Sequence, residues 1–369
     1  MIRRILVTVA LAVVFASCAS KPDLDESQTP RSRYGALSGE SAVGVIPEGV
    51  LRDETRHKDV PITVEYPTRP GPHPLIIFSH GYGSSNRAYA GLSSYWASQG
   101  YVVVKPGHAD ANRMPDQRNV QDIWQNQTAA DWRERVRDVT FIIDSLDMLE
   151  KSYPELQGKI DHTKIGVGGH SYGAYTAMLV GGVRTYPGAV SYADPRVTAV
   201  MAMSPQGPGE VRGLTRDSWT ELHKPAMFMT GSEDRGVTEE ETPEWRRQAF
   251  ELSPAGDKVL VVVAGARHGS YTGRLDAPLI SPYDTRQQPA IINDPVNDPR
   301  RDPNRDPYYP DQTDRRPREA AAGMRQRGVF STIKAVSLMF WDTYLQGTAE
   351  GREALDKAGE RFGVELVKK

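Results

Sequence analysis

The chain has 369 residues, and its 45 lysines and arginines nearly balance 47 aspartates and glutamates, for a formal net charge of −2. This balance excludes both the basic footprint of a nucleic-acid-binding protein and an acidic tail. The 38% apolar and 25% charged residues are typical of a soluble globular body, and the length suits one large or two small domains.

The first predicted element is an export signal. Arg3 and Arg4 precede an apolar run over residues 5–15, which is too short to span a bilayer as a helix. Cys18 is the only cysteine, so no intrachain disulfide or cysteine metal cluster is predicted. Residues 1–17 resemble a bacterial lipoprotein signal, which implies lipidation of Cys18, export and anchoring to a membrane. Ala19 and Ser20 imply the outer membrane; a plain secretory signal is the alternative.

Residues 18–44 are polar and predict a flexible tether. The alternation over residues 60–67 predicts an antiparallel edge strand, and the apolar run over residues 75–78 predicts a buried parallel strand. A helix is expected to end at Gly100, and the next strand covers residues 101–104. Residues 106–127 are turn-rich and are expected over the entrance to a site, and an amphipathic helix is predicted over residues 129–151.

The second half of the pattern alternates in the same way. Strands are predicted over residues 164–168, 197–203, 226–230 and 258–263, and a helix over residues 239–252. This alternation predicts an α/β fold whose mostly parallel central sheet has helices on both faces. We expect residues 45–369 to form a single domain, in which the last core helix covers residues 328–346.

An insertion interrupts this domain at about residues 271–320. It contains Asp-Pro pairs at every fourth residue between positions 294 and 307, and proline at that spacing forbids an α-helix. A row of aspartates is compatible with calcium binding, and a solvated insertion is the alternative. The spacing of a known calcium loop is absent, so no metal site is predicted.

The chemistry is concentrated in the motif Gly169-His170-Ser171-Tyr172-Gly173, which follows a strand and opens a helix. Such a turn holds a serine out at the edge of a sheet. A serine nucleophile needs a base and a group that orients the base, and in this arrangement the acid and then the histidine follow along the chain. Asp234 and His268 follow the next strands and are the predicted acid and base, with Glu233 as the reserve acid.

The other histidines are expected to have other places. His170 adjoins the serine and should pack into the fold, and His108 could line the entrance. Surface or loop positions are expected for four further histidines: His57, His73, His162 and His223. The backbone N–H groups of Tyr82 and Tyr172 are the predicted oxyanion hole, because the loop His80-Gly81-Tyr82-Gly83 follows a buried strand.

These motifs, with the runs over residues 73–105 and 340–345, resemble the α/β-hydrolase superfamily. The resemblance is to its platelet-activating-factor acetylhydrolase and dienelactone-hydrolase-like branch, with bacterial cutinase-like polyester hydrolases as relatives. It implies a serine esterase that cleaves short-chain or lipid-like carboxylic esters through an acyl-enzyme. The implied nucleophile, base and orienting acid are Ser171, His268 and Asp234. No cofactor and no nucleic-acid partner are implied. Dienelactone hydrolases use cysteine where this chain has Ser171, so their reaction is not implied.

Two alternatives remain at this point. An amidase or peptidase of the same fold would use the same three residues, because such a triad does not distinguish leaving groups. A non-catalytic surface lipoprotein could keep the fold and bind a partner through the insertion.

Overall fold

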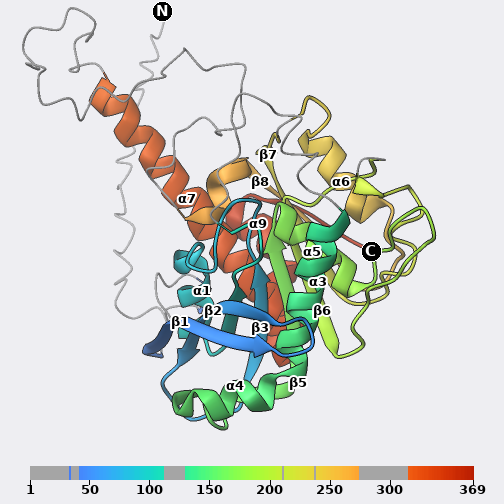
Figure 1. Ribbon diagram of the computed structural model, residues 1–369. Coiled ribbons are helices and arrows are strands. Elements are labelled where there is room, and N and C mark those ends of the chain that lie inside the picture. Colours follow the sequence, from blue (N-terminus) through green and yellow to red (C-terminus); the bar gives the residue numbers. More distant parts are fainter. Residues whose placement is uncertain (1–32, 35–40, 112–128, 210–211, 237, 274–314) are drawn as a thin grey trace, which may run out of the picture. The chain divides into compact units, whose positions relative to one another are not determined.

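The computed structural model describes residues 33–34, 41–111, 129–209, 212–236, 238–273 and 315–369 (Figure 1). Residues 33–369 form one compact unit, and residues 1–32 are a separate unit. The predicted signal segment with Cys18, most of the predicted tether and the Asp-Pro repeat lie outside the described residues.

One nine-stranded sheet organises the described residues, in the order β1-β2-β4-β3-β5-β6-β7-β8-β9. The five central pairings, from β4–β3 to β7–β8, are parallel, and the pairings β1–β2, β2–β4 and β8–β9 are antiparallel. The strands are β1 Val43–Asp53, β2 Lys58–Pro67, β3 His73–Ser79, β4 Val102–Pro106, β5 Ile160–His170, β6 Val197–Met203, β7 Ala226–Glu233, β8 Lys258–Arg267 and β9 Glu365–Lys368. This confirms the predicted mostly parallel sheet.

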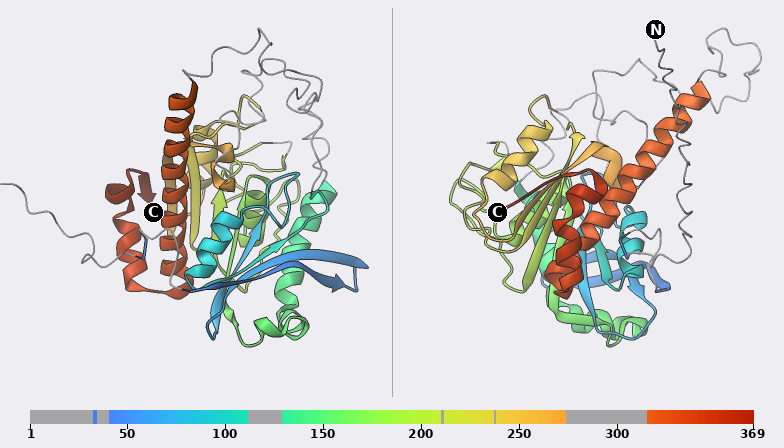
Figure 2. Two further views of the ribbon diagram at one scale, coloured as in Figure 1. Left: turned by 90° about the vertical axis from the view of Figure 1, so that its left-hand side faces the viewer. Right: turned by 180° about the vertical axis from the view of Figure 1, so that it is seen from behind.

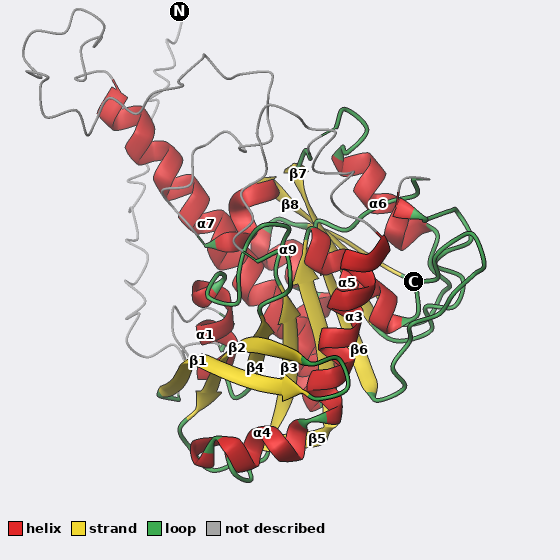
Figure 3. Cartoon of the chain, in the orientation of Figure 1, coloured by secondary structure: helices red, strands yellow, loops and turns green. Residues whose placement is uncertain are grey.

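Helices cover both faces of this sheet (Figure 3). Figure 2 shows the ribbon from two further sides. On one face of the sheet, apolar side chains from α3, α4, α5 and α6 pack against the strands, and on the other face those from α1, α7, α8 and α9 do so. The helices are α1 Ala90–Ser98, α3 Ala129–Asp144, α4 Leu146–Ser152, α5 Tyr172–Gly181, α6 Pro243–Glu251, α7 Arg315–Trp341, α8 Ala349–Asp356 and α9 Ala358–Phe362, with shorter helical turns at η1 Pro154–Leu156, η3 His268–Thr272 and η6 Asp342–Gln346.

The continuous apolar runs of the sequence form central strands of the sheet. Every residue of β3 and of β4 is buried, as expected for parallel strands that are covered on both faces. The prediction for residues 60–67 was right about the antiparallel pairing but wrong about the edge, because β1 covers the outer side of β2. Sequence patterns hid β1, since Pro47 and Gly49 interrupt its alternation and a bulge between Ile46 and Gly49 accommodates them.

Several helix boundaries differ from the predictions. The helix predicted over residues 129–151 is divided at Ser145 into α3 and α4. Helix α6 begins only at Pro243, because the Thr242 hydroxyl accepts the Trp245 N–H and caps the first turn there. Helix α7 begins at Arg315, inside the stretch predicted as insertion. Strand β9 was not predicted, because it is short and polar.

The chain enters this body at Arg33 and Tyr34. The Arg33 Nε–H donates to the buried Asp342 carboxylate over 2.8 Å, and the Tyr34 hydroxyl donates to it over 2.9 Å. Tyr101, just before β4, donates to the same carboxylate over 2.6 Å. Asp342 thus ties the start of the described chain to the amino end of a central strand. Within the described residues, no helix has the length and apolar character needed to cross a membrane.

Candidate active site

Ser171 lies on a sharp turn between β5 and α5, with φ of 55° and ψ of −119°. The two glycines around it are needed for packing. A Cβ on Gly169 would overlap the Gly173 carbonyl, and a Cβ on Gly173 would overlap the Ser79 carbonyl at the end of β3. The serine therefore sits in a strained conformation that its neighbours enforce, as the sequence pattern predicted.

The structure brings the three predicted catalytic side chains together. The Ser171 Oγ lies 3.0 Å from the His268 Nε2, and the His268 Nδ1 lies 3.0 Å from the Asp234 Oδ1. Each of the three is the first residue after its strand: Ser171 follows β5, Asp234 follows β7 and His268 follows β8. All three therefore lie at the carboxyl edge of the parallel strands. With its proton on Nδ1, His268 donates to Asp234 and leaves Nε2 to accept the serine hydroxyl.

Asp234 is fully buried and surrounded by donors. Its Oδ2 accepts hydrogen bonds from the Ser204 and Thr230 hydroxyls, and its Oδ1 lies 3.2 Å from the Arg246 Nε. Burial alone would raise the pKa of this carboxyl, but the Arg246 charge and the hydrogen bonds from His268 and Ser204 outweigh it and hold the pKa well below its usual range. Asp234 is therefore charged throughout the neutral range.

Glu233, the reserve acid, is placed elsewhere. Its side chain is exposed and accepts a hydrogen bond over 2.7 Å from the Arg267 Nε. Neighbouring residues at the end of β7 thus point to different sides, and Asp234 is the one that reaches His268.

The loop after β3 lies beside the start of α5. The aromatic rings of Tyr82 and Tyr172 meet edge to face with centroids 6.1 Å apart. Because a Cβ on Gly173 would also crowd the His80 carbonyl, the backbone of the two segments is in close contact. The loop that carries Tyr82 therefore lies beside the segment that carries Tyr172, and the oxyanion role of their N–H groups stays a prediction.

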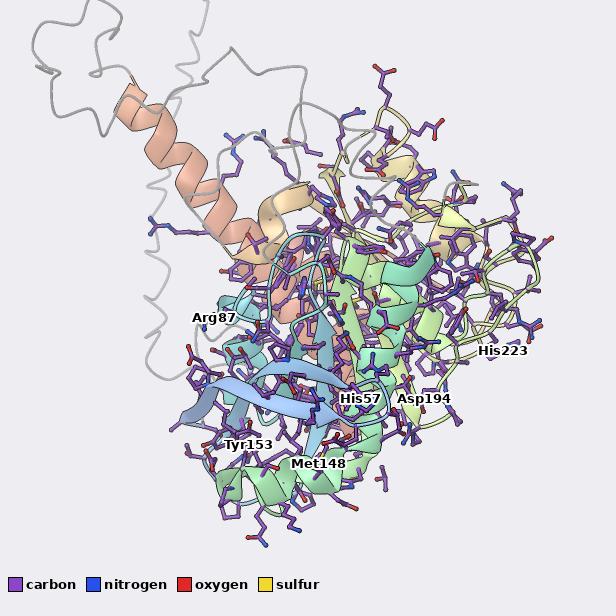
Figure 4. All side chains as sticks on the ribbon, viewed as in Figure 1. His57, Arg87, Met148, Tyr153, Asp194 and His223 are labelled. Carbon is purple, nitrogen blue, oxygen red and sulfur yellow. The ribbon has the colours of Figure 1, made fainter. Side chains whose placement is uncertain are left out.

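The remaining histidines do not join the triad. His170 is buried and packs as predicted: its Nδ1 accepts a hydrogen bond from the Tyr89 hydroxyl over 2.9 Å. The expectation that His108 lines the entrance is wrong, since its side chain is fully buried between Ser79 and Asp138. His57 and His223 are exposed (Figure 4), as is His162. The expectation for His73 is wrong, because it is the first residue of the buried strand β3.

Sequence reasoning missed several groups that shape the site. Arg246 comes from α6 and Ser204 from the end of β6, and both contact Asp234 only because the sheet brings three strand ends together. Arg246 Nη2 also lies 3.3 Å from the His268 Nδ1, where both groups carry protons and share Asp234 as their acceptor. The one local signal is the position of Ser204, which follows a predicted strand.

The described residues contain no cluster of three or more histidine, cysteine or acidic side chains that could hold a metal ion.

Comparison with known proteins points to the same fold class. A family model described as chlorophyllase matches residues 40–192, a stretch that includes Tyr82 and Ser171. Together with the sheet order and the serine turn, this match shows the fold class. The chain has an α/β-hydrolase fold.

The chain is also similar to a curated protein, the platelet-activating factor acetylhydrolase of Cavia porcellus. The two are 24% identical over 135 residues, and the similarity covers 29% of this chain and 31% of the acetylhydrolase. The chain thus matches under a third of the relative's length. These similarities confirm the predicted fold class and the predicted resemblance.

Proposed function

We propose that this α/β-hydrolase cleaves carboxylic esters by nucleophilic catalysis at Ser171. The observation that carries the proposal is the continuous relay from the Ser171 Oγ through His268 to Asp234, with a distance of 3.0 Å at each step. The similarities to a chlorophyllase family model and to an acetylhydrolase support ester substrates over amides. An intact relay also argues against a role restricted to partner binding.

In the first half of the reaction, the Ser171 oxygen attacks the carbonyl carbon of the ester while its proton passes to the His268 Nε2. The carbonyl oxygen becomes an oxyanion, which the backbone N–H groups of Tyr82 and Tyr172 stabilise. The bond to the alcohol oxygen then breaks, and His268 returns the proton to the leaving alcohol. The product is an acyl-serine.

In the second half, water attacks the acyl-serine. His268 takes a proton from the water as it adds to the carbonyl carbon, and gives this proton to the Ser171 oxygen as the acid leaves. Asp234, charged and buried, stabilises the imidazolium form of His268 in both halves. No cofactor takes part in this scheme.

The test uses the full-length chain and two variants. A fluorophosphonate should label the wild type on Ser171, which mass spectrometry of the peptide would locate, and p-nitrophenyl esters of increasing chain length should be hydrolysed. Ser171→Ala should lose the label and at least about 10⁴-fold in kcat, whereas Ser191→Ala, which alters an exposed loop serine, should keep both. Labelling and turnover that persist in Ser171→Ala would refute the proposal.

We further propose that the chain is exported and anchored to a membrane by lipid on Cys18. The support is the sequence alone: a basic start, a short apolar run and a cysteine after small residues. Expression in a bacterial host fed with a radiolabelled fatty acid should label the wild type and not Cys18→Ser. Equal labelling of both chains would refute lipidation at this residue.

A further inference from the structure

A buried charged pair lies directly under the loop that carries Tyr82, and the proposed reaction does not use it. Arg135 comes from α3 and Asp110 from the segment after β4, and their side chains are only 1% and 2% exposed. The Arg135 Nε and Nη2 donate to the two Asp110 oxygens over 2.9 and 2.6 Å. This is a two-point pairing that fixes the orientation of the guanidinium plane.

The pair forms hydrogen bonds with the backbone on both sides of Tyr82. The Arg135 Nη1 donates to the His80 carbonyl over 2.7 Å, and the Asp110 Oδ2 accepts the Gly83 N–H over 3.2 Å. The Gly81 carbonyl lies 3.5 Å from the Arg135 Nη2 and accepts the His80 Nδ1–H over 2.7 Å. The peptide groups that flank Tyr82 are therefore held by charged or buried partners.

The same guanidinium also contacts the other half of the proposed oxyanion hole. It stacks over the Tyr172 ring at 4.4 Å from the ring centre, the geometry of a cation–π interaction. Tyr172 is the first residue of α5, and its ring also meets the Tyr82 ring. Arg135 is thus in contact with both segments whose N–H groups would bind the oxyanion.

Two neutral histidines complete the surroundings of the pair. Burial, and then the Arg135 charge, lower the pKa of His80 and of His108. His108 donates from Nδ1 to Asp138 and accepts the Ser79 hydroxyl at Nε2 over 2.9 Å, while the His80 Nε2 accepts the His108 N–H over 3.2 Å. Because both rings are neutral, Arg135 is the cation that Asp110 balances at this loop.

We propose that the Arg135–Asp110 pair is the positioning device of the oxyanion hole: it fixes the loop of Tyr82 against Tyr172 at the spacing that a tetrahedral intermediate requires. This inference rests on the proposed ester hydrolysis. A hole that is correctly spaced stabilises the transition state more than the bound ester, so its distortion should lower kcat and leave KM nearly unchanged.

The test compares two changes at the pair with one matched change nearby. Asp110→Asn keeps the shape but removes the charge and one acceptor, and Arg135→Lys keeps the charge but cannot bridge the carboxylate and the loop. The matched control is Asp138→Asn, which alters an equally buried carboxylate that pairs with Arg56, Lys58 and His108 but does not contact the loop.

Each change at the pair should lower kcat on a p-nitrophenyl ester about 10- to 100-fold, with KM within about twofold, because a misplaced group costs up to about 10²-fold. The inhibition constant of a trifluoromethyl ketone, whose adduct with Ser171 carries an oxyanion, should rise by the same factor. Asp138→Asn should lower the unfolding temperature at least as much as Asp110→Asn but change kcat by less than about threefold.

The proposal is overturned if folded Asp110→Asn or Arg135→Lys keeps the kcat and the ketone affinity of the wild type. It is also overturned if the loss of activity in all three variants simply follows the decrease in their unfolding temperatures. If one of the paired variants does not fold, the other decides. Failure of the proposed function itself looks different: the wild type would neither hydrolyse esters nor react with the fluorophosphonate.

Discussion

Asp234→Asn separates two roles of the buried carboxylate. The Asp234 Oδ1 receives the His268 Nδ1–H and lies 3.2 Å from the Arg246 Nε, and neither of these N–H groups can accept a hydrogen bond, while the Oδ2 receives two hydroxyls. A hydroxyl can accept as well as donate. The asparagine should therefore place its NH₂ toward Ser204 and Thr230 and keep its oxygen toward His268. The histidine tautomer is retained, and only the negative charge is lost.

The size of this loss follows from the charge. A carboxylate about 4.5 Å from the centre of an imidazolium, at an effective dielectric constant of about 20, stabilises it by roughly 3–4 kcal/mol. Each 1.36 kcal/mol corresponds to a factor of ten in rate, so kcat/KM should fall about 10²- to 10³-fold. This is less than the loss of about 10⁴-fold expected when the tautomer is wrong.

The assay is kcat/KM on one p-nitrophenyl ester at pH 8, with circular dichroism to show that each variant is folded. Asp234→Ala should lose more than Asp234→Asn, because it offers His268 no acceptor. Adding Ser204→Ala and Thr230→Val to Asp234→Asn removes the groups that accept the amide, and should lower activity at least a further tenfold. A loss under threefold or above 10⁴-fold for Asp234→Asn alone would refute the reasoning.

Three further predictions concern stability. Gly173→Ala should yield little folded protein, because its Cβ would overlap the Ser79 carbonyl; a soluble variant with the wild-type unfolding temperature would contradict this. Asp342→Ala should cost about 3–5 kcal/mol, as for a broken buried ion pair, and should speed tryptic cleavage after Arg33; unchanged proteolysis would count against the anchoring contact. Acid should weaken the fold in urea below about pH 6.5, because the unfolded chain binds protons there that the folded chain does not. The responsible groups are three histidines whose pKa values burial lowers, namely His80, His108 and His170. A free energy of unfolding that stays constant between pH 7.5 and 5.5 would refute their role.

The strand-turn pattern of the sequence was enough to predict the central sheet and the three side chains of the relay. Ser171, Asp234 and His268 each come shortly after a predicted strand, and the ends of parallel strands meet at one edge. The sequence favoured Asp234 but could not exclude Glu233 as the acid, because the answer depends on which way each side chain leaves the end of β7.

The residues that support the site, such as Arg135, could not be predicted from the sequence for a different reason. Arg135 lies 55 residues from His80 along the chain, in the middle of an amphipathic helix where an arginine is expected to face water. Only the packing of α3 against the loop shows that it is buried. Strand β1 could not be predicted, because its proline and glycine interrupt the alternation of apolar and polar residues. In the structure, a bulge in the pairing with β2 accommodates them.

The contact of Arg33 and Tyr34 with Asp342 also fixes where the described chain enters the body. It lies at the amino end of the parallel strands, beside Tyr101, whereas Ser171, Asp234 and His268 lie at the carboxyl end. The entry of the chain and the reactive serine are therefore separated by the length of the parallel strands, and a change at the entry point does not touch the relay.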